Sequence, residues 1–200
     1  MNAMFKKGVL ASVLAVATSS AMAASSVDIQ VTGKIVPSSC TPAFISGGGI
    51  ADFGTIKVAS LNSTTPTPLA DVKIIPISIT CEEATRIAVT FNDAHADSAP
   101  TETYSINYVD LDFITSPEYT AGLGMYNDKK IGAYSLGIQQ TKGAVTNDAG
   151  DDLYPTVSAD NGGSWGSKAG IRYLQVKTNK SELYSFSTEL GGTPVAQTKV

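Results

Sequence analysis

The fold is decided by residues 75–81, which read Ile75-Pro76-Ile77-Ser78-Ile79-Thr80-Cys81. The three isoleucines and the cysteine occupy every second position, so their side chains project from one face of an extended chain. Pro76 lacks a backbone N–H and therefore predicts an edge or a bulge. The stretch predicts a half-buried β-strand that directs Cys81 into the core.

Outward from this strand, the rest of the chain also favours β-structure. Ile87, Val89 and Phe91 alternate with other residues, and the short stretch Glu82-Glu83-Ala84-Thr85 before them predicts a turn and a β-hairpin. Further alternating stretches predict strands near 104–109, 134–138, 171–177 and 183–190. Residues 141–169 are rich in Asn, Asp and Gly and predict a long excursion. Short strands between turns, without helical periodicity, predict an all-β sandwich in one domain.

Residues 1–23 have the features of a signal peptide. Lys6 and Lys7 form a cationic head, residues 8–17 are apolar, and Ala21 and Ala23 supply the small residues needed for cleavage after Ala23. The apolar stretch is shorter than the roughly 20 residues of a spanning helix, which disfavours the alternative of a membrane anchor. We expect an exported protein with no membrane span after signal removal.

Cys40 and Cys81 are the two cysteines of the chain. In an exported protein an even number of cysteines favours a disulfide. It would close a loop of about 42 residues and stabilise the fold by roughly 4 kcal/mol in the chain-entropy model. Two free thiols, or half of a metal site, are the alternatives, and the lack of a nearby histidine disfavours the metal.

Charge and motifs disfavour several functional classes. Without Lys6 and Lys7 the chain has 12 basic and 18 acidic residues, a net charge of −6, and its longest basic run is Lys129-Lys130. Such a chain is not expected to bind nucleic acid, which requires clustered cations. The run Gly47-Gly48-Gly49 is not followed by the residues of a phosphate-binding loop and predicts a bend. No cofactor is expected.

Candidate catalytic or metal-binding residues are few. His95, between Asp93 and Asp97, would suit a metal site or an acid–base pair, whereas a solvated loop is the simpler interpretation. No nucleophile-elbow motif is present, and we expect no enzyme and no metal. An acidic group offers hard oxygen ligands for calcium, but its spacing matches no EF-hand, and turn chemistry is the alternative. Its members are Asn147, Asp148, Asp151, Asp152, Asp160 and Asn161.

The single tryptophan, Trp165, lies in the glycine-rich run Gly162-Gly163-Ser164-Trp165-Gly166. A tryptophan in a loop can stack on a sugar or contact a partner. The alternative is that Trp165 covers one end of the core.

The N-terminal part of the chain carries a family resemblance. In residues 27–35 the odd positions are apolar or glycine, Cys40 follows Gly33 by seven residues, and the strand 77–81 ends on the second cysteine. This order resembles the N-terminal extension and first strand of chaperone–usher pilins. The chain also resembles a periplasmic fimbrial-subunit-like family of Gram-negative bacteria. The stretches that carry this second resemblance are Ile35-x-Pro37-x-x-Cys40-Thr41-Pro42, residues 46–54, 60–62, 77–81, 121–124, 130–135 and 192–196.

The resemblance implies an incomplete immunoglobulin-like (pilin-type) β-sandwich over residues 37–200, preceded by a donor strand at 24–36. A neighbouring subunit's extension would complete the sandwich by β-augmentation. Its apolar side chains would enter pockets of the groove, with glycine where the groove is shallow, while an ordinary first strand is the alternative. These donor-strand residues are Val27, Ile29, Val31, Gly33 and Ile35.

The functional expectation follows from this resemblance. We expect a structural or adhesive fimbrial-type subunit, assembled by donor-strand exchange in the periplasm or on the cell surface of a Gram-negative bacterium. Neighbouring subunits, a periplasmic chaperone and an outer-membrane usher would be its partners. Relatives continue past the position of Val200, so the chain is expected to be short at its C-terminus. The alternative is a monomeric periplasmic binding or regulatory protein on the same fold.

Overall fold

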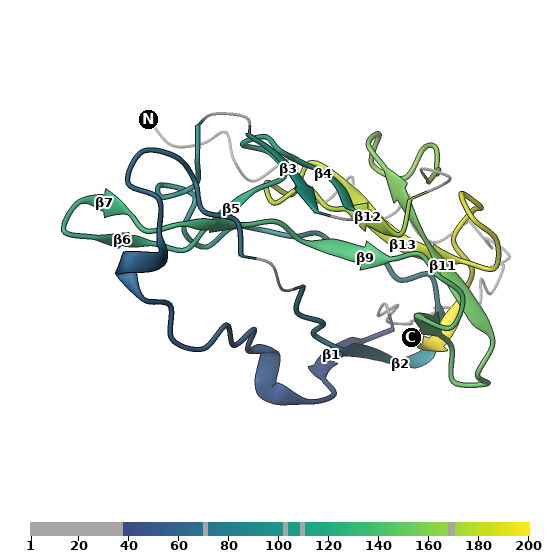
Figure 1. Ribbon diagram of the computed structural model, residues 1–200. Helices are drawn as coiled ribbons and strands as arrows, with labels where there is room; N and C mark the ends of the chain where they lie inside the picture. Colours follow the sequence, from purple (N-terminus) through teal and green to yellow (C-terminus); the bar gives the residue numbers. More distant parts are fainter. Residues whose placement is uncertain (1–37, 70–71, 102–103, 109–110, 168–170) are drawn as a thin grey trace, which may run out of the picture. The chain divides into compact units, whose positions relative to one another are not determined.

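The computed structural model describes residues 38–69, 72–101, 104–108, 111–167 and 171–200 (Figure 1). The chain divides into the units Met1–Val36 and Pro37–Val200, and all described residues belong to the second unit. These residues are organised as β-strands and turns, with no α-helix among them, and the predicted all-β class is confirmed. No helix in the described part is long and apolar enough to cross a membrane.

Fourteen strands and two short 3-10 turns make up the described structure. The strands are β1 Cys40–Phe44, β2 Ile77–Thr85, β3 Tyr104–Tyr108, β4 Leu111–Thr115, β5 Ala121–Gly122, β6 Met125–Tyr126, β7 Lys129–Lys130, β8 Ala133–Tyr134, β9 Gly137–Gln139, β10 Val145–Thr146, β11 Asp152–Ser158, β12 Tyr173–Gln175, β13 Leu183–Ser187 and β14 Gln197–Lys199. The 3-10 turns are η1 Gly47–Gly49 and η2 Val58–Ser60, and both lie in the long connection between β1 and β2.

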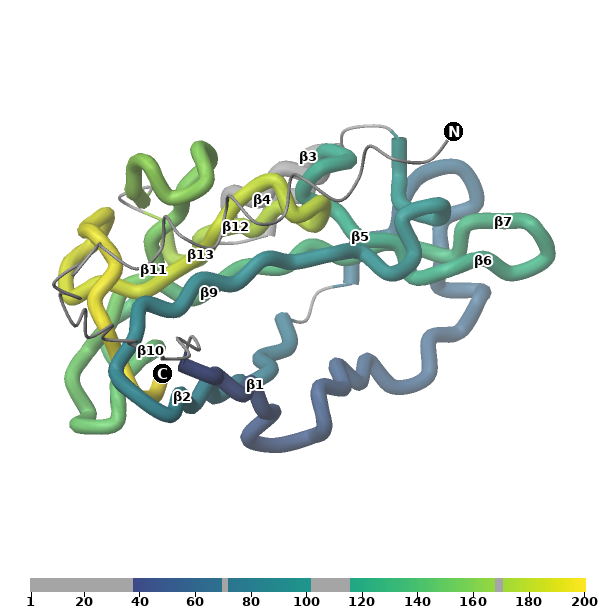
Figure 2. The backbone as a smooth tube through the Cα atoms, turned by 180° about the vertical axis from the view of Figure 1, so that it is seen from behind, coloured from purple at the N-terminus to yellow at the C-terminus, as the bar shows by residue number. Residues whose placement is uncertain are grey.

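Two three-stranded antiparallel sheets carry the core. One has the order β1-β2-β14 and the other β10-β11-β13. Beyond β14, Val200 and Ile79 exchange backbone hydrogen bonds of 2.7 and 3.0 Å. The C-terminal end of the chain accordingly lies beside β2 in both views (Figure 1, Figure 2).

The sheets pack together across one apolar cluster, as in a sandwich. Ile79 and Cys81 of β2 meet Leu153 of β11 and Phe186 of β13 in this cluster. A second cluster contains Tyr184 of β13, and Val89 and Ile138 pack against both clusters. The prediction that Cys81 points into the core is therefore confirmed, since only 6% of this residue is exposed.

The predicted hairpin between 75–81 and 87–91 is wrong. Strand β2 continues through the expected turn to Thr85, because β14 pairs Gln197 with Thr85. The following residues then reach β13, where Val89 bridges to Tyr184. Residues 82–84 resembled a turn because Glu82 and Glu83 are polar, and in the structure all three residues are exposed on the strand.

The expected excursion at 141–169 contains β11, the central strand of the second sheet. Strand β11 aligns Pro155 with Phe186 of β13, and Pro155 is almost completely buried. A proline normally demotes a predicted strand. Here β10 pairs with β11 only at Asp152 and Leu153, so the strand next to β11 has ended before Pro155.

Candidate functional site

Strand β1 presents an open edge. On its inner side Ser39 C=O accepts a hydrogen bond from Glu82 N–H, and Ile45 N–H donates to Pro76 C=O, each at 3.0 Å. Because backbone groups alternate in direction along a strand, those of Cys40, Pro42 and Phe44 face outward. Within the described residues no strand pairs with this outer edge. Proline is tolerated at such an outward position because its missing N–H would have no ladder partner.

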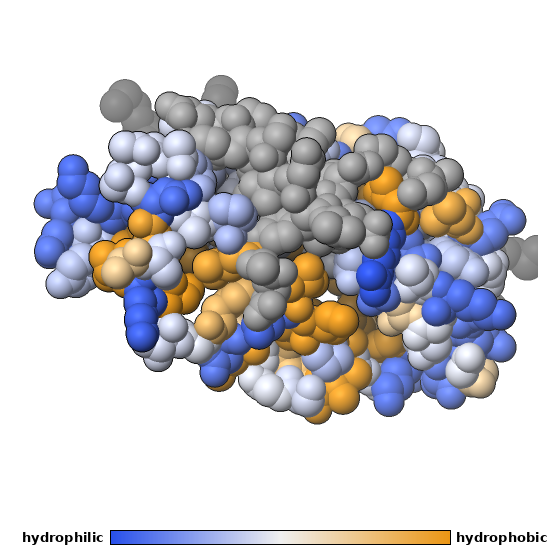
Figure 3. All heavy atoms as spheres, in the orientation of Figure 1, coloured by the Kyte–Doolittle hydropathy of each residue, from blue (hydrophilic) through white to orange (hydrophobic). Residues whose placement is uncertain are grey.

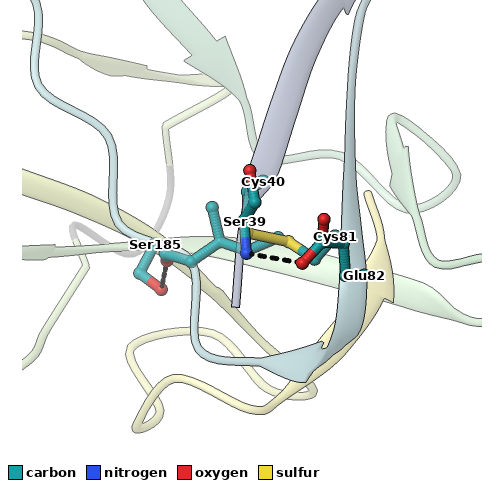
Figure 4. The surroundings of a disulfide bond; sticks show 6 residues. Ser39, Cys40, Cys81, Glu82 and Ser185 are labelled. Atoms are coloured by element: carbon teal, nitrogen blue, oxygen red, sulfur yellow. Dashed lines mark hydrogen bonds between the residues drawn. A yellow bond between two sulfur atoms is a disulfide. The ribbon is translucent and has the colours of Figure 1, made fainter. Parts of the chain in front are cut away.

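The predicted disulfide between Cys40 and Cys81 is confirmed and joins this edge strand to the core. The two cysteines lie opposite each other in the β1–β2 register. Figure 4 shows Ser39 N–H directed at the Glu82 carboxylate, at 3.4 Å, on the adjacent pair of residues. Ser185, also near the bond, donates from Oγ to Ile87 C=O at 2.5 Å. The covalent bond thus fixes an edge strand whose remaining side chains are exposed.

An exposed apolar segment follows the open edge. Among the described residues from Thr41 to Ile77 none is buried. Several of its side chains are large and apolar, and Val58 is 83% exposed, Ile50 75% and Ile45 67%. Figure 3 shows apolar side chains at the surface around β1 and β2. Single exposed apolar residues are ordinary, but a group of this kind is typical of an interaction surface.

A second exposed apolar group surrounds the β6–β7 hairpin. Asn127 and Asp128 form its turn with positive φ angles of 48° and 57°, as a two-residue hairpin requires. Large apolar side chains lie on β6 and β8 and directly after β5 and β7. They are Leu123, Met125, Tyr126, Ile131 and Tyr134, each at least 40% exposed.

Trp165 lies on a turn that the Asp160 carboxylate organises. Asp160 accepts hydrogen bonds from Ser158 Oγ at 2.7 Å, from Ser164 N–H at 2.8 Å and from Ser164 Oγ at 2.6 Å. These hydrogen bonds, led by the one from Ser164 Oγ, hold the pKa of Asp160 well below its usual range. Trp165 itself is half-buried and lines a hollow of about 210 Å³. The structure thus places Trp165 at the rim of a hollow.

We expect Asp160→Asn to loosen this turn, because the amide cannot accept the same three donors. Acrylamide quenching of Trp165 fluorescence should increase, while Asp151→Asn, in the neighbouring acidic loop, should leave it unchanged. The pKa of Asp160 is lowered on folding, so its ionised carboxylate stabilises the folded turn. This stabilisation is complete above about pH 4 and is lost as the pH falls further. Quenching of the unchanged protein should therefore stay constant from pH 7 to about 4. Equal quenching in Asp160→Asn and the original chain would contradict this assignment.

The other predicted residues have separate surroundings. The donor-strand residues Val27, Ile29, Val31, Gly33 and Ile35, and the signal peptide, lie outside the described residues. His95 N–H donates to Asp93 Oδ1 at 2.8 Å, within an exposed turn. Gly47–Gly49 form the η1 turn directly after β1, with positive φ angles, in agreement with the predicted bend.

The acidic residues of 147–161 accept hydrogen bonds from separate donors. Asp148 accepts from Thr198 Oγ1, Asp151 from Asn147 Nδ2, and Asp152 from Gly143 N–H. In the part of the chain that the structure describes, no three His, Cys, Asp or Glu side chains gather in a way that could hold a metal ion.

Two features of this surface were not predicted from the sequence. Strand β1 was not expected at Cys40–Phe44, although Pro42 is the kind of residue that marks an edge strand. Arg86, which lines the hollow beside Trp165, was not singled out. Its rarity could have drawn attention to it, since Arg86 is one of only two arginines in the chain.

Comparisons with known proteins find similar proteins and a matching family model. The chain is 32% identical over 173 residues to Protein GltF of Escherichia coli (strain K12), covering 78% of this chain and 67% of GltF. It is 33% identical over 138 residues to the uncharacterized protein YhcF of the same strain, covering 64% of this chain and 56% of YhcF, so it spans little more than half of that relative. No solved structure matches. Residues 29–135 match the family described as "Protein of unknown function (DUF1120)", and the chain belongs to this family.

Proposed function

We propose that the chain is an exported fimbrial-type structural subunit without catalytic activity. The N-terminal extension of one subunit would pair with the open β1 edge of the next. The observation that carries this proposal is the outer edge of β1, with which no strand of the described residues pairs, next to the exposed apolar segment between β1 and β2. The pilin-like order of residues 27–40 supports it from the sequence. A periplasmic chaperone and an outer-membrane usher would be the further partners, in the periplasm or at the cell surface.

The chemistry of the two surfaces is complementary. The outer edge of β1 offers the N–H and C=O groups of Cys40 and Phe44 and the C=O of Pro42 to an incoming strand. An added strand gains affinity from these backbone bonds and specificity from its alternate side chains. Val27, Ile29 and Val31 share one face of such a strand and would cover exposed apolar side chains on one face of β1, such as Phe44.

One observation favours a second candidate, a monomer that completes its own fold. Only four residues, 36–39, connect the alternating stretch to β1. This length is within the range of a hairpin loop, so the extension could pair with β1 of its own chain. Such a protein would be a periplasmic binding or regulatory protein on the same fold.

The proposal predicts that assembly depends on the apolar face of the extension. We compare Ile29→Asp/Val31→Asp with Gln30→Asp/Thr32→Asp in the full chain recovered from the periplasm. The two variants add equal charge on opposite faces of the same strand. Burying an aspartate costs several kcal/mol, so the first variant should associate at least ~100-fold more weakly, while the second keeps the original oligomers.

The readout is the oligomer distribution in size-exclusion chromatography with light scattering. If the unchanged chain is monomeric at all concentrations and Ile29→Asp/Val31→Asp only destabilises it, the extension pairs within its own chain and the subunit proposal fails. Equal loss of oligomers in both variants would show that charge alone matters, which also contradicts strand donation.

A further inference from the structure

The hollow beside Trp165 lies where two paired strands separate. Val89 and Tyr184 exchange backbone hydrogen bonds of 2.8 and 2.9 Å. Two residues further along β13, Phe186 C=O instead accepts from Val195 N–H at 3.1 Å. The hollow of about 210 Å³ opens between residues 86–88 and 193–194 at this separation. It is therefore a consequence of the strand geometry in the core.

The lining of the hollow combines one cation, one aromatic ring and hydroxyl groups. Ile87 and Ser185 are buried in it, and Trp165 is half-buried. Arg86 is exposed, and among the described residues no hydrogen bond or ion pair reaches its guanidinium. The lining contains no carboxylate, and the hydroxyl-bearing Thr193 is exposed at it. The lining itself thus carries a positive charge on a chain whose net charge is negative.

The aromatic side of the hollow is held in place before any ligand arrives. Val157 and Gly166 exchange backbone hydrogen bonds of 2.7 and 3.0 Å on one side of Trp165. On the other side Asp160 ties the turn through Ser164. A Cβ atom at Gly162 would lie 3.7 Å from the indole ring, so the turn passes close to it. A ring fixed in this way loses little conformational freedom when a ligand stacks on it.

We infer that this hollow binds an acidic monosaccharide unit, a pyranose ring bearing a carboxylate. The carboxylate would accept paired hydrogen bonds from the Arg86 guanidinium, a geometry that arginine favours. The apolar face of the sugar would stack on the Trp165 indole, and a ring hydroxyl would bond to Thr193. The volume is below the roughly 300–1,000 Å³ of sites for drug-sized ligands and suits a single ring. This binding is independent of strand donation.

Trp165 is the single tryptophan of the chain, so its fluorescence reports directly on the hollow. We expect D-glucuronate to change the emission saturably, with a Kd on the order of 1 mM for a ligand of this size. D-Glucose has the pyranose ring without the carboxylate, and acetate has the carboxylate without the ring. Each should bind at least ~10-fold more weakly. Arg86→Gln should weaken D-glucuronate binding at least ~10-fold, whereas Arg172→Gln, the same change at the other arginine, should not.

Three results would overturn the inference. They are an absence of saturable change up to about 20 mM D-glucuronate, well above the expected Kd, equal affinity for D-glucose, and equal weakening by Arg86→Gln and Arg172→Gln. Calorimetry on Trp165→Leu provides a check that does not use fluorescence. Retained affinity in that variant would likewise remove the indole from the site.

Discussion

The Cys40→Ala/Cys81→Ala double variant is expected to lose about 4 kcal/mol of unfolding free energy, because the bond closes a loop of about 42 residues. For a domain of this size the loss corresponds to a fall in Tm on the order of 10 °C. The structure adds a second reason. Side chains 41–44 of β1 are exposed, so little burial holds this strand to the core once the covalent bond is removed.

The measurement is equilibrium urea unfolding, combined with hydrogen exchange of β1 and β2 amides. The original chain treated with a thiol reductant should match the double variant, since both lack the same bond. Thr41→Ala, an exposed change in the same strand, is the control and should stay within about 0.5 kcal/mol of the original. A double variant as stable as this control, with β1 amides still protected, would show that strand pairing alone holds the edge.

The core strand that ends near Cys81 could be predicted because its signal is local. Ile79 and Cys81 alternate with polar residues, and both are buried in the structure. The extent of β2 could not be predicted, because it depends on pairing of Thr85 with Gln197, 112 residues away. Strand β11 was missed for a similar reason, since its proline is acceptable only because β10 ends at the right place.

The candidate site likewise has parts that could be predicted from the sequence and parts that could not. The cysteine pair and the special position of Trp165 were visible in the sequence, because rare residues carry their own signal. The open edge and the hollow could not be predicted. Both depend on where strand pairing ends among the described residues, and this is set by contacts between distant parts of the chain. Phe44 and Ile45 are ordinary apolar residues in the sequence. Only the sheet order shows that they lie at a strand edge with no pairing strand in the part of the chain that the structure describes.

The second large effect is expected at Tyr184, which has no exposed surface. Its ring meets that of Phe91 edge to face, with 5.7 Å between ring centroids. Its hydroxyl accepts from Lys177 N–H at 2.7 Å and donates to Glu182 Oε2 at 2.5 Å. Tyr184→Ala should therefore cost about 3–5 kcal/mol of unfolding free energy, comparable to other buried aromatic truncations.

Tyr184→Phe separates the ring from the hydroxyl. It keeps the packing but leaves Lys177 N–H and one Glu182 oxygen without this partner, at a cost of about 1–3 kcal/mol. Tyr126→Ala is the matched control, because Tyr126 is 71% exposed, and it should change stability by less than about 0.5 kcal/mol. If Tyr184→Phe were as damaging as Tyr184→Ala, the hydroxyl network rather than the ring would hold β13.

The same residue predicts how stability depends on alkaline pH. Burial, followed by the hydrogen bond to Glu182, raises the pKa of Tyr184 far above its usual value near 10. The folded state therefore retains this proton more strongly than the unfolded state does. The resulting stabilisation is complete below about pH 10 and decreases as the pH rises further. Above pH 10 the urea midpoint of the original chain should fall more steeply than that of Tyr184→Phe. The reason is that the Tyr184 hydroxyl can ionise only when the core opens, whereas phenylalanine has no proton to lose.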